Sequence, residues 1–195
     1  MRQLLLALFS LLVLTTAAPA QVILNGDFET GDLSSWTQFG DTDFSGVDSA
    51  NPNTGTFAGS FGPPTAGGIT QDVATVIGQA YEITYFLSVS SFGSPEDNSF
   101  QADFGTTNLQ TLTNATDSGY VSFTFLATAT ANLTPLSFTF QNGPGVWNLD
   151  DVSISTASVG VPEISSHGAA QPLALMVLML FLTSTRRRRL VFRAG

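Results

Sequence analysis

Residues 81–89 read YEITYFLSV, and this stretch decides the fold. Large apolar side chains recur in it at every second position. A repeat of two places them on one face of an extended strand and the residues between them on the other face. The residues of the apolar face are Tyr81, Ile83, Tyr85, Leu87 and Val89. The pattern predicts a strand with one buried and one solvated face, as in antiparallel sheets.

The same alternation occurs in three further stretches, SFQADFG at 99–105, YVSFTFLA at 120–127 and LSFTF at 136–140. Shorter strands are expected at 22–24, 69–73 and 147–154. Joints rich in Gly, Pro and Asn separate the strands, notably 49–68 and 92–98. About eight short strands without helical periodicity predict an all-β fold, an antiparallel β-sandwich of the jelly-roll kind. We expect five aromatic side chains between its sheets: Phe123, Phe125, Phe138, Phe140 and Trp147.

The composition narrows the chemistry of the domain. The chain has 195 residues, of which 43% are hydrophobic, with 18 Gly, 16 Phe and no Cys. Without Cys there is no disulfide, thiolate nucleophile or Cys-bound metal. Residues 3–185 contain no Lys or Arg, and the net charge is −9. This charge argues against nucleic acid as a partner and against direct ion pairs with an acidic polysaccharide.

The N-terminus has the layout of a secretory signal peptide. Arg2 precedes an apolar run at 4–14, and Ala18-Pro19-Ala20 follows. We expect cleavage after Ala20, which makes residues 1–20 the signal peptide and 21–157 the exported β-sandwich domain. A buried or spanning helix is the alternative, for which the apolar run is short.

The C-terminus has the layout of a membrane anchor. Residues 169–185 are almost entirely apolar, and at about 1.5 Å per residue they span roughly 26 Å, near the hydrocarbon thickness of a bilayer. Four consecutive arginines follow: Arg186, Arg187, Arg188 and Arg189. Such a cluster stays in the cytoplasm. We therefore expect a linker at 158–168, a transmembrane helix at 169–185 and a basic cytoplasmic tail at 186–195.

The linker contains Val161-Pro162-Glu163. This tripeptide, the apolar helix and the arginine cluster together resemble the PEP-CTERM sorting signal. The resemblance implies recognition by exosortase, a membrane-embedded processing enzyme of Gram-negative bacteria that make exopolysaccharide. It also implies an inner-membrane-anchored precursor that ends at the cell surface or in a biofilm matrix. Ile164 stands where the usual motif has Pro, and a plain membrane anchor is the alternative.

A second resemblance covers residues 22–156. The motifs LNGDFETGDLSSW, GGITQDV, GQAYEITYFLSV and WNLDDVSI follow one another along the chain. This succession resembles the galactose-binding-like jelly roll of many carbohydrate-binding modules. That fold hosts sugar binders, adhesive modules and purely structural domains, so it leaves the function open.

Few routes to catalysis are available to the domain. The only His is His167 in the tail, and without Cys, Lys or His no catalytic triad, Schiff base or His-ligated zinc can form. The domain holds 14 of the 15 carboxylates. Glu96-Asp97 is the nearest approach to a catalytic pair, and a turn explains it better. We expect no enzyme and no catalytic residue.

The second resemblance implies a structural calcium ion that joins the first strand region to the last. Glu29, Asp150 and Asp151 match its usual ligand positions, and Asp27 is a weaker match. Neighbouring residues of a regular strand point to opposite faces, so only one of Asp150 and Asp151 is expected to be a full ligand. The alternative is that these carboxylates cap turns and keep the surface acidic.

Two functions remain open at this point. One is a non-enzymatic structural protein of the exopolysaccharide matrix, and the other is a carbohydrate-binding module with a defined glycan site. Trp36 and Trp147 lie in motifs whose Trp is normally part of the core. Four loop phenylalanines are within reach of a glycan: Phe39, Phe44, Phe57 and Phe92. A cleft with exposed aromatic rings and convergent polar side chains would favour the binding module, and a bland acidic surface would favour the structural protein.

Overall fold

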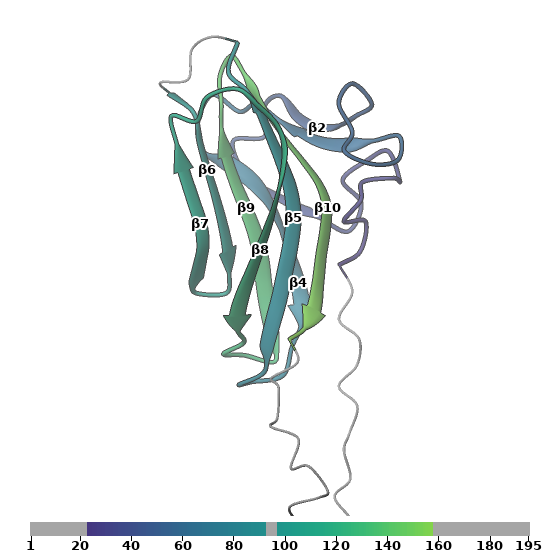
Figure 1. Cartoon of the computed structure of the whole chain (residues 1–195), viewed down its shortest axis with the longest axis vertical. Helices are drawn as coiled ribbons and strands as arrows, with labels where there is room; N and C mark the ends of the chain where they lie inside the picture. The colour runs from purple at the N-terminus through teal and green to yellow at the C-terminus, as the bar shows by residue number, and fades with distance from the viewer. Residues whose placement is uncertain (1–22, 93–96, 158–195) are drawn as a thin grey trace, which may run out of the picture. The chain divides into compact units, whose positions relative to one another are not determined.

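The structure is a computed structural model that describes residues 23–92 and 97–157. They form a sandwich of two five-stranded antiparallel sheets (Figure 1). The predicted fold class is therefore confirmed. The sandwich belongs to a compact unit that ends at Ala157 and carries its own hydrophobic core. The strand ladders and the hydrophobic core lie within this unit, as expected of a domain that folds by itself.

The strand order in the first sheet is β1-β4-β9-β6-β7. In that order its strands are β1 (Thr37–Gly40), β4 (Gly67–Ala74), β9 (Leu133–Gln141), β6 (Ser99–Phe104) and β7 (Thr107–Thr113). The order in the second sheet is β2-β3-β10-β5-β8. Its strands are β2 (Ser45–Asp48), β3 (Ala58–Phe61), β10 (Val146–Thr156), β5 (Ala80–Ser90) and β8 (Ser118–Thr128). The edges on one side are thus β1 and β2, and the edges on the other side are β7 and β8.

The stretch at 81–89 lies within β5, between β10 and β8. Its alternating residues all face the core, with Tyr81, Ile83 and Tyr85 completely buried. The ring of Tyr85 lies 5.2 Å from that of Phe138 in an edge-on arrangement. Aromatic rings prefer such offset or edge-on contacts.

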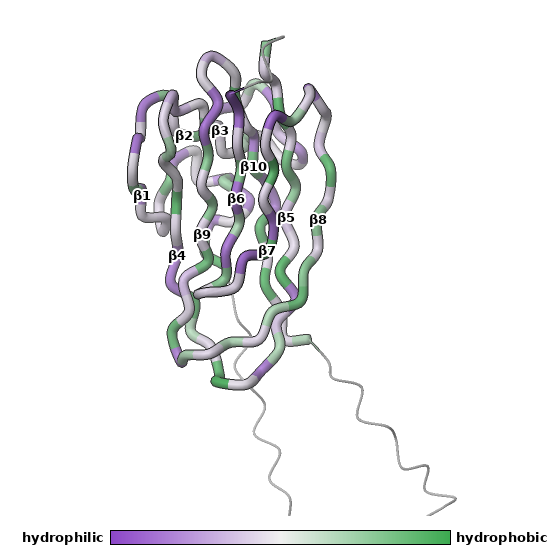
Figure 2. Tube along the Cα trace, turned by 90° about the vertical axis from the view of Figure 1, so that its left-hand side faces the viewer, coloured by the Kyte–Doolittle hydropathy of each residue, from purple (hydrophilic) through white to green (hydrophobic). Residues whose placement is uncertain are grey.

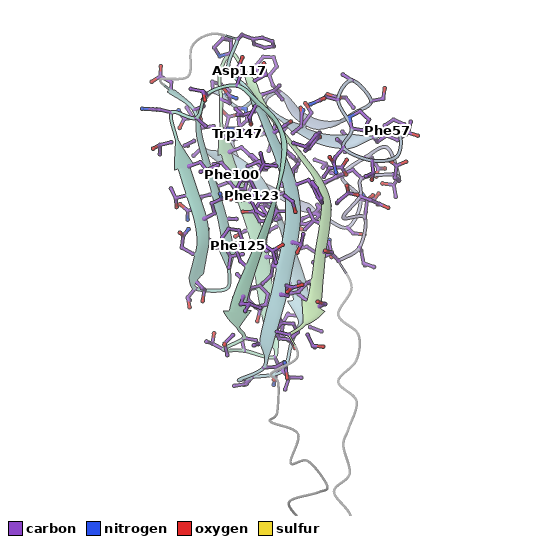
Figure 3. All side chains as sticks on the ribbon, viewed as in Figure 1. Phe57, Phe100, Asp117, Phe123, Phe125 and Trp147 are labelled. Atoms are coloured by element: carbon purple, nitrogen blue, oxygen red, sulfur yellow. The ribbon has the colours of Figure 1, made fainter. Side chains whose placement is uncertain are left out.

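The predicted aromatic core is confirmed, with a difference at one edge. Phe138, Phe140 and Trp147 are at most 1% exposed. Phe123 and Phe125 pack against the same core but are only half-buried (Figure 3). They lie on β8, the edge strand of its sheet in the part of the chain that the structure describes, so the rings are covered by a neighbouring strand on one side.

Four strands were not predicted from the sequence, and a predicted one is absent. β3 lies inside the expected joint at 49–68, and β1, β2 and β7 lack long apolar alternation. Ile23 and Leu24 form no regular strand. The side chain of Gln71 instead accepts a hydrogen bond from the Leu24 N–H at 2.8 Å and donates one to its carbonyl at 2.9 Å. A side-chain amide thus takes the place of a partner strand.

The sandwich has two ends with different loops. Loops 41–44, 62–66, 114–117 and 142–145 meet at the end drawn uppermost in Figure 1. Loops 75–79 and 129–132 lie at the lower end, where Ala157 donates a hydrogen bond to the Ala80 carbonyl. In the described part of the chain, no helix is long and apolar enough to cross a membrane. The predicted signal peptide, Val161-Pro162-Glu163 motif, membrane helix and arginine cluster lie outside the described residues.

Candidate functional site

A cleft of about 720 Å³ opens at the upper end of the sandwich. This volume is within the usual range of ligand sites. Four loops and the adjoining strand ends contribute to its lining, which is aromatic, proline-rich and glycine-rich. The lining residues are Phe44, Ser60, Gly62, Pro64, Phe92, Gly143, Pro144, Gly145 and Val146. We call this site the end cleft.

Phe44 and Phe92 are the large side chains of the end cleft. They are 81% and 71% exposed. Both have a positive φ, 52° and 50°, which is uncommon for a bulky residue that is not Gly. Holding a residue in such a backbone conformation costs on the order of 1 kcal/mol. Two exposed rings held in this way at one cleft are typical of a binding site.

Asp41 fixes the loop that carries Phe44. Its carboxylate accepts hydrogen bonds from the Asp43 N–H at 3.0 Å and from the Thr65 hydroxyl at 2.8 Å. These bonds, with one from the Thr65 N–H, lower the pKa of Asp41. The Phe44 carbonyl also accepts a hydrogen bond from the Gly62 N–H at 2.9 Å. The loop is therefore tied at two points, Gly62 and Thr65, to the segment that joins β3 to β4.

Asp117 fixes the loop that carries Phe92 (Figure 3). Its Oδ1 accepts hydrogen bonds from the hydroxyl and the N–H of Ser91, the latter at 2.6 Å. These two bonds lower the pKa of Asp117. Each exposed phenylalanine is thus positioned by its own aspartate outside the cleft, Phe44 by Asp41 and Phe92 by Asp117.

The floor of the end cleft is formed by closely packed backbone. A Cβ on Gly145 would lie 2.2 Å from the Ser90 carbonyl oxygen, so only Gly fits there. Asn142, which is 2% exposed, donates its side-chain N–H to the same carbonyl at 3.2 Å. This packing gives the cleft a rigid base.

The chemistry of the lining points to an uncharged ligand. None of the nine lining residues is ionisable. The surrounding loops are acidic, with Asp41, Asp43 and Asp117 beside the opening. An anion would be repelled by these carboxylates, whereas aromatic and proline rings offer apolar surfaces for stacking.

The other aromatic residues considered from the sequence lie elsewhere. Trp36 and Trp147 are 7% and 1% exposed, which confirms that they belong to the core. Phe39 lies over Gly68 on the outer face of the first sheet, with Cζ 2.9 Å from the position of a Gly68 Cβ. Phe57 is half-buried against Gly31 (Figure 3). The sequence marked Phe44 and Phe92 as loop residues, but their convergence depends on loops far apart in the chain.

The predicted metal ligands gather around a different feature, loop 49–57. The carboxylate of Asp150 is completely buried and accepts hydrogen bonds from the N–H groups of Asn53 at 2.8 Å and Thr54 at 3.2 Å. Burial raises the pKa of Asp150, and these bonds oppose the rise. Glu29 accepts bonds from the N–H groups of Thr56 and Phe57, both at 2.8 Å. The carboxylates therefore fasten this loop.

Asp151 reaches the same loop as Asp150. It accepts hydrogen bonds from the Asn53 amide and the Thr54 hydroxyl, both at 2.8 Å. The expectation that neighbouring aspartates point to opposite faces is wrong here. Asp151 has a φ of 49°, and the register of β10 against β5 shifts between Asp150 and Ser153. Such a β-bulge turns two successive side chains to one side.

Calcium at these carboxylates stays a prediction. Asp27 lines a hollow of about 480 Å³ together with Asp151, and Asp150 is not among the lining residues. Within residues 23–92 and 97–157, no three carboxylate, His or Cys side chains lie close enough together to hold a metal ion. The carboxylate oxygens of Glu29 and Asp150 are aimed instead at backbone N–H groups.

Loop 49–57 covers the outer face of the second sheet. Asn51 donates its side-chain amide to the Ser88 hydroxyl at 3.2 Å, and Tyr120 donates its hydroxyl to the Asn51 carbonyl at 2.7 Å. Burial, with the nearby Asp150 charge, raises the pKa of Tyr120, so its hydroxyl stays a donor. We call this segment the covering loop.

Comparisons with known proteins support the fold. A scan against models of protein families found no match, and a search of curated proteins found none. Among solved structures, TmCBM61 in complex with β-1,4-galactotriose is 16% identical with a TM-score of 0.55, over 69% of this chain and 97% of that chain. The CBM22-1 xylan-binding domain of Paenibacillus barcinonensis Xyn10C is 18% identical with a TM-score of 0.52, over 72% and 97%.

A third similar structure holds a catalytic module as well. The CBM22-1–GH10 modules of Clostridium thermocellum endo-1,4-β-D-xylanase 10B, complexed with xylohexaose, are 16% identical with a TM-score of 0.52, over 71% of this chain and 29% of that chain. At such identities the likeness shows the fold alone. That fold is the jelly roll of carbohydrate-binding modules, as the sequence motifs indicated.

Proposed function

We propose that the domain binds an uncharged extracellular polysaccharide at the end cleft. The observation that carries this proposal is the pair of exposed phenylalanines, Phe44 and Phe92, in a rigid cleft without ionisable lining residues. The C–H faces of a sugar ring are apolar and can stack on an aromatic ring. The shared fold with carbohydrate-binding modules supports the same proposal.

We propose binding without catalysis. The end cleft has no carboxylate in its lining, and glycoside hydrolysis requires a pair of them about 5–10 Å apart across the scissile bond. Residues 3–166 also contain no Lys, Arg, His or Cys that could take over acid–base or nucleophilic roles.

We further propose that the chain is exported and sorted by exosortase. The signal-peptide layout at 1–20, the Val161-Pro162-Glu163 motif, the apolar segment at 169–185 and the arginine cluster support this route. The precursor would be anchored in the inner membrane of a Gram-negative bacterium. The processed protein would then reside at the cell surface or in an exopolysaccharide matrix, where its domain would hold a glycan. Mass spectrometry of the surface protein should find a C-terminus near Pro162, and an intact tail ending at Gly195 would contradict processing.

The binding test compares neutral with acidic polysaccharides. Calorimetry of the domain should show binding to a neutral glycan such as xylan or β-galactan and none to alginate. Phe44→Ala and Phe92→Ala should each weaken binding about tenfold, which corresponds to about 1.4 kcal/mol. Leu126→Ala is the matched control, because Leu126 is 69% exposed but lies on β8 outside the cleft.

Two outcomes would contradict the proposal. One is equal binding by Phe44→Ala, Phe92→Ala and the Leu126 control. The other is an absence of binding to every neutral glycan, which would favour a purely structural role in the matrix.

A further inference from the structure

β8 forms an unusually open edge of the second sheet. It spans eleven residues, Ser118–Thr128, and among residues 23–92 and 97–157 it pairs with β5 alone. Alternate N–H and C=O groups of an edge strand point away from the sheet. Proteins commonly protect such edges with charged residues, proline or short strands. β8 contains no charged residue and no proline.

Both faces of β8 leave apolar surface exposed. Val121 and Leu126 are 46% and 69% exposed. Phe123 and Phe125 face the core but are only half-buried, because no strand of the described part of the chain lies beyond β8. Figure 2 looks onto this side of the sandwich. Along β8 it shows no strongly hydrophilic residue. Another strand beside β8 would satisfy its free backbone groups and cover these rings.

The distribution of charge indicates where a second copy of the domain can approach. The domain carries 14 carboxylates and no cation, so two copies repel each other over most of their surface. β7 and β8 are both free of charged residues, and they form one side of the sandwich (Figure 1). Two copies can therefore approach along this side without placing carboxylates opposite one another.

We propose that two copies of the domain associate by antiparallel pairing of β8 with β8. A two-fold axis through the middle of the strand, near Phe123, would join the two sheets into one continuous ten-stranded sheet, since each contributes five strands. Such isologous contacts are the commonest form of dimer, and strand addition to a sheet edge is an established recognition mode. No residue of β8 lines the end cleft, and the covering loop contacts β8 at Tyr120, away from the middle of the strand.

The first experiment measures the association of the domain by analytical ultracentrifugation. We expect a concentration-dependent monomer–dimer equilibrium. Ser122→Glu places a carboxylate on the exposed face at the middle of β8 and should weaken the dimer at least tenfold. Thr139→Glu is the matched control, because it adds the same charge to β9, which lies inside its sheet. Thermal unfolding should show that both variants fold.

The second experiment uses the absence of Cys from the chain. Variants with a single Cys at Ser118, Ser122 or Thr124 are mixed in pairs and oxidised, and disulfide-linked dimers are quantified. With the axis at Phe123, position 122 of one copy lies opposite position 124 of the other, so a mixture of Ser122→Cys and Thr124→Cys should cross-link, whereas a mixture of Ser118→Cys and Thr124→Cys should not.

Three results would overturn the proposal. They are a strictly monomeric domain up to millimolar concentration, equal dimerisation by Ser122→Glu and Thr139→Glu, and equal cross-linking in the two mixtures. A failure of glycan binding would leave this proposal unaffected, because the strand edge and the end cleft are separate.

Discussion

The two sides of the sandwich deal with their strand edges differently. On one side the edges are β1 and β2, each of four residues, with Asp41, Asp43 and Asp48 beside or within them. On the other side β7 has seven residues and β8 eleven, and neither contains a charge. Short, acidic edges discourage strand addition, and long uncharged ones permit it. The same fold thus carries one closed side and one open side.

The covering loop, which joins β2 to β3, begins and ends on the closed side and is fastened by carboxylate hydrogen bonds. Asp150→Ala would leave the N–H groups of Asn53, Thr54 and Asp151 without their acceptor. We expect a loss of about 3 kcal/mol in the free energy of unfolding, since each of the three hydrogen bonds to this buried carboxylate contributes about 1 kcal/mol. Chemical denaturation measures this.

Asp72→Ala is the control for that variant, because Asp72 is exposed on β4. If Asp150→Ala unfolded no more easily than Asp72→Ala, the covering loop would not depend on the buried carboxylate. The closed side would then owe its stability to the strands alone.

Bound calcium would add stability near the closed side and none to β7 and β8. If it binds near Glu29, Asp150 and Asp151, it should stabilise the closed side by about 1.4 kcal/mol at a tenfold excess over Kd. Millimolar calcium should then raise the melting temperature more than sodium at equal ionic strength. Glu29→Ala should abolish the difference between the two salts, and Asp117→Ala should preserve it. Equal shifts with both salts would show that these carboxylates only fasten the loop and keep the surface acidic.

Asp117 lies where the open side meets the end cleft, directly before β8. Asp117→Ala should free the loop of Phe92 and weaken glycan binding about fivefold. The Phe92 side chain would then no longer be ordered beforehand, and fixing it on binding costs free energy. Since the pKa of Asp117 is lowered in the folded domain, its contribution is present above the ordinary Asp pKa of 3.8 and is lost as the pH falls through the lowered value. Binding isotherms at neutral and acidic pH test both statements.

Asp43→Ala is the matched control in the same end, because no hydrogen bond to the Asp43 carboxylate fixes the loop of Phe44. Equal binding by the Asp117 and Asp43 variants would contradict the positioning role of Asp117.

Ionic strength should have the smallest of these effects, and it acts on the β8 dimer of the open side. Raising the ionic strength from about 0.01 M to 0.15 M shortens the Debye length from about 30 Å to 8 Å. Repulsion between the two acidic domains then falls, and the β8 dimer should strengthen a few-fold. Sedimentation at the two salt concentrations would show it, and a dimer weakened by salt would indicate that charge pairs hold it instead.

The strands that the sequence predicted are those with large residues on the buried face. β5, β6, β8 and β9 fulfil this condition, and their alternation fixed which residues face the core. β3 escaped prediction because three of its four residues, Ala58, Gly59 and Ser60, are small, and both of its faces are largely buried. A period of two cannot appear when both faces are covered.

The site was less predictable than the fold. The bulge at Asp151 depends on local backbone conformation that no residue pattern announces. The end cleft depends on the convergence of four loops separated by up to about a hundred residues, which only the sheet order determines. Phe44 and Phe92 could be named as exposed loop residues, but not as neighbours of one cleft.

β10 connects the features described above in a single strand. Its first residue, Val146, lines the end cleft, and its last, Thr156, lies where the chain leaves the domain. At about 3.3 Å per residue, its eleven residues span roughly 36 Å. If a glycan in the cleft is pulled against a C-terminal anchor, the tension runs lengthwise along this strand. β10 is flanked by β3 and β5, and its hydrogen bonds lie perpendicular to the pull. They must therefore break together under shear rather than one by one, which is the arrangement that best resists mechanical load.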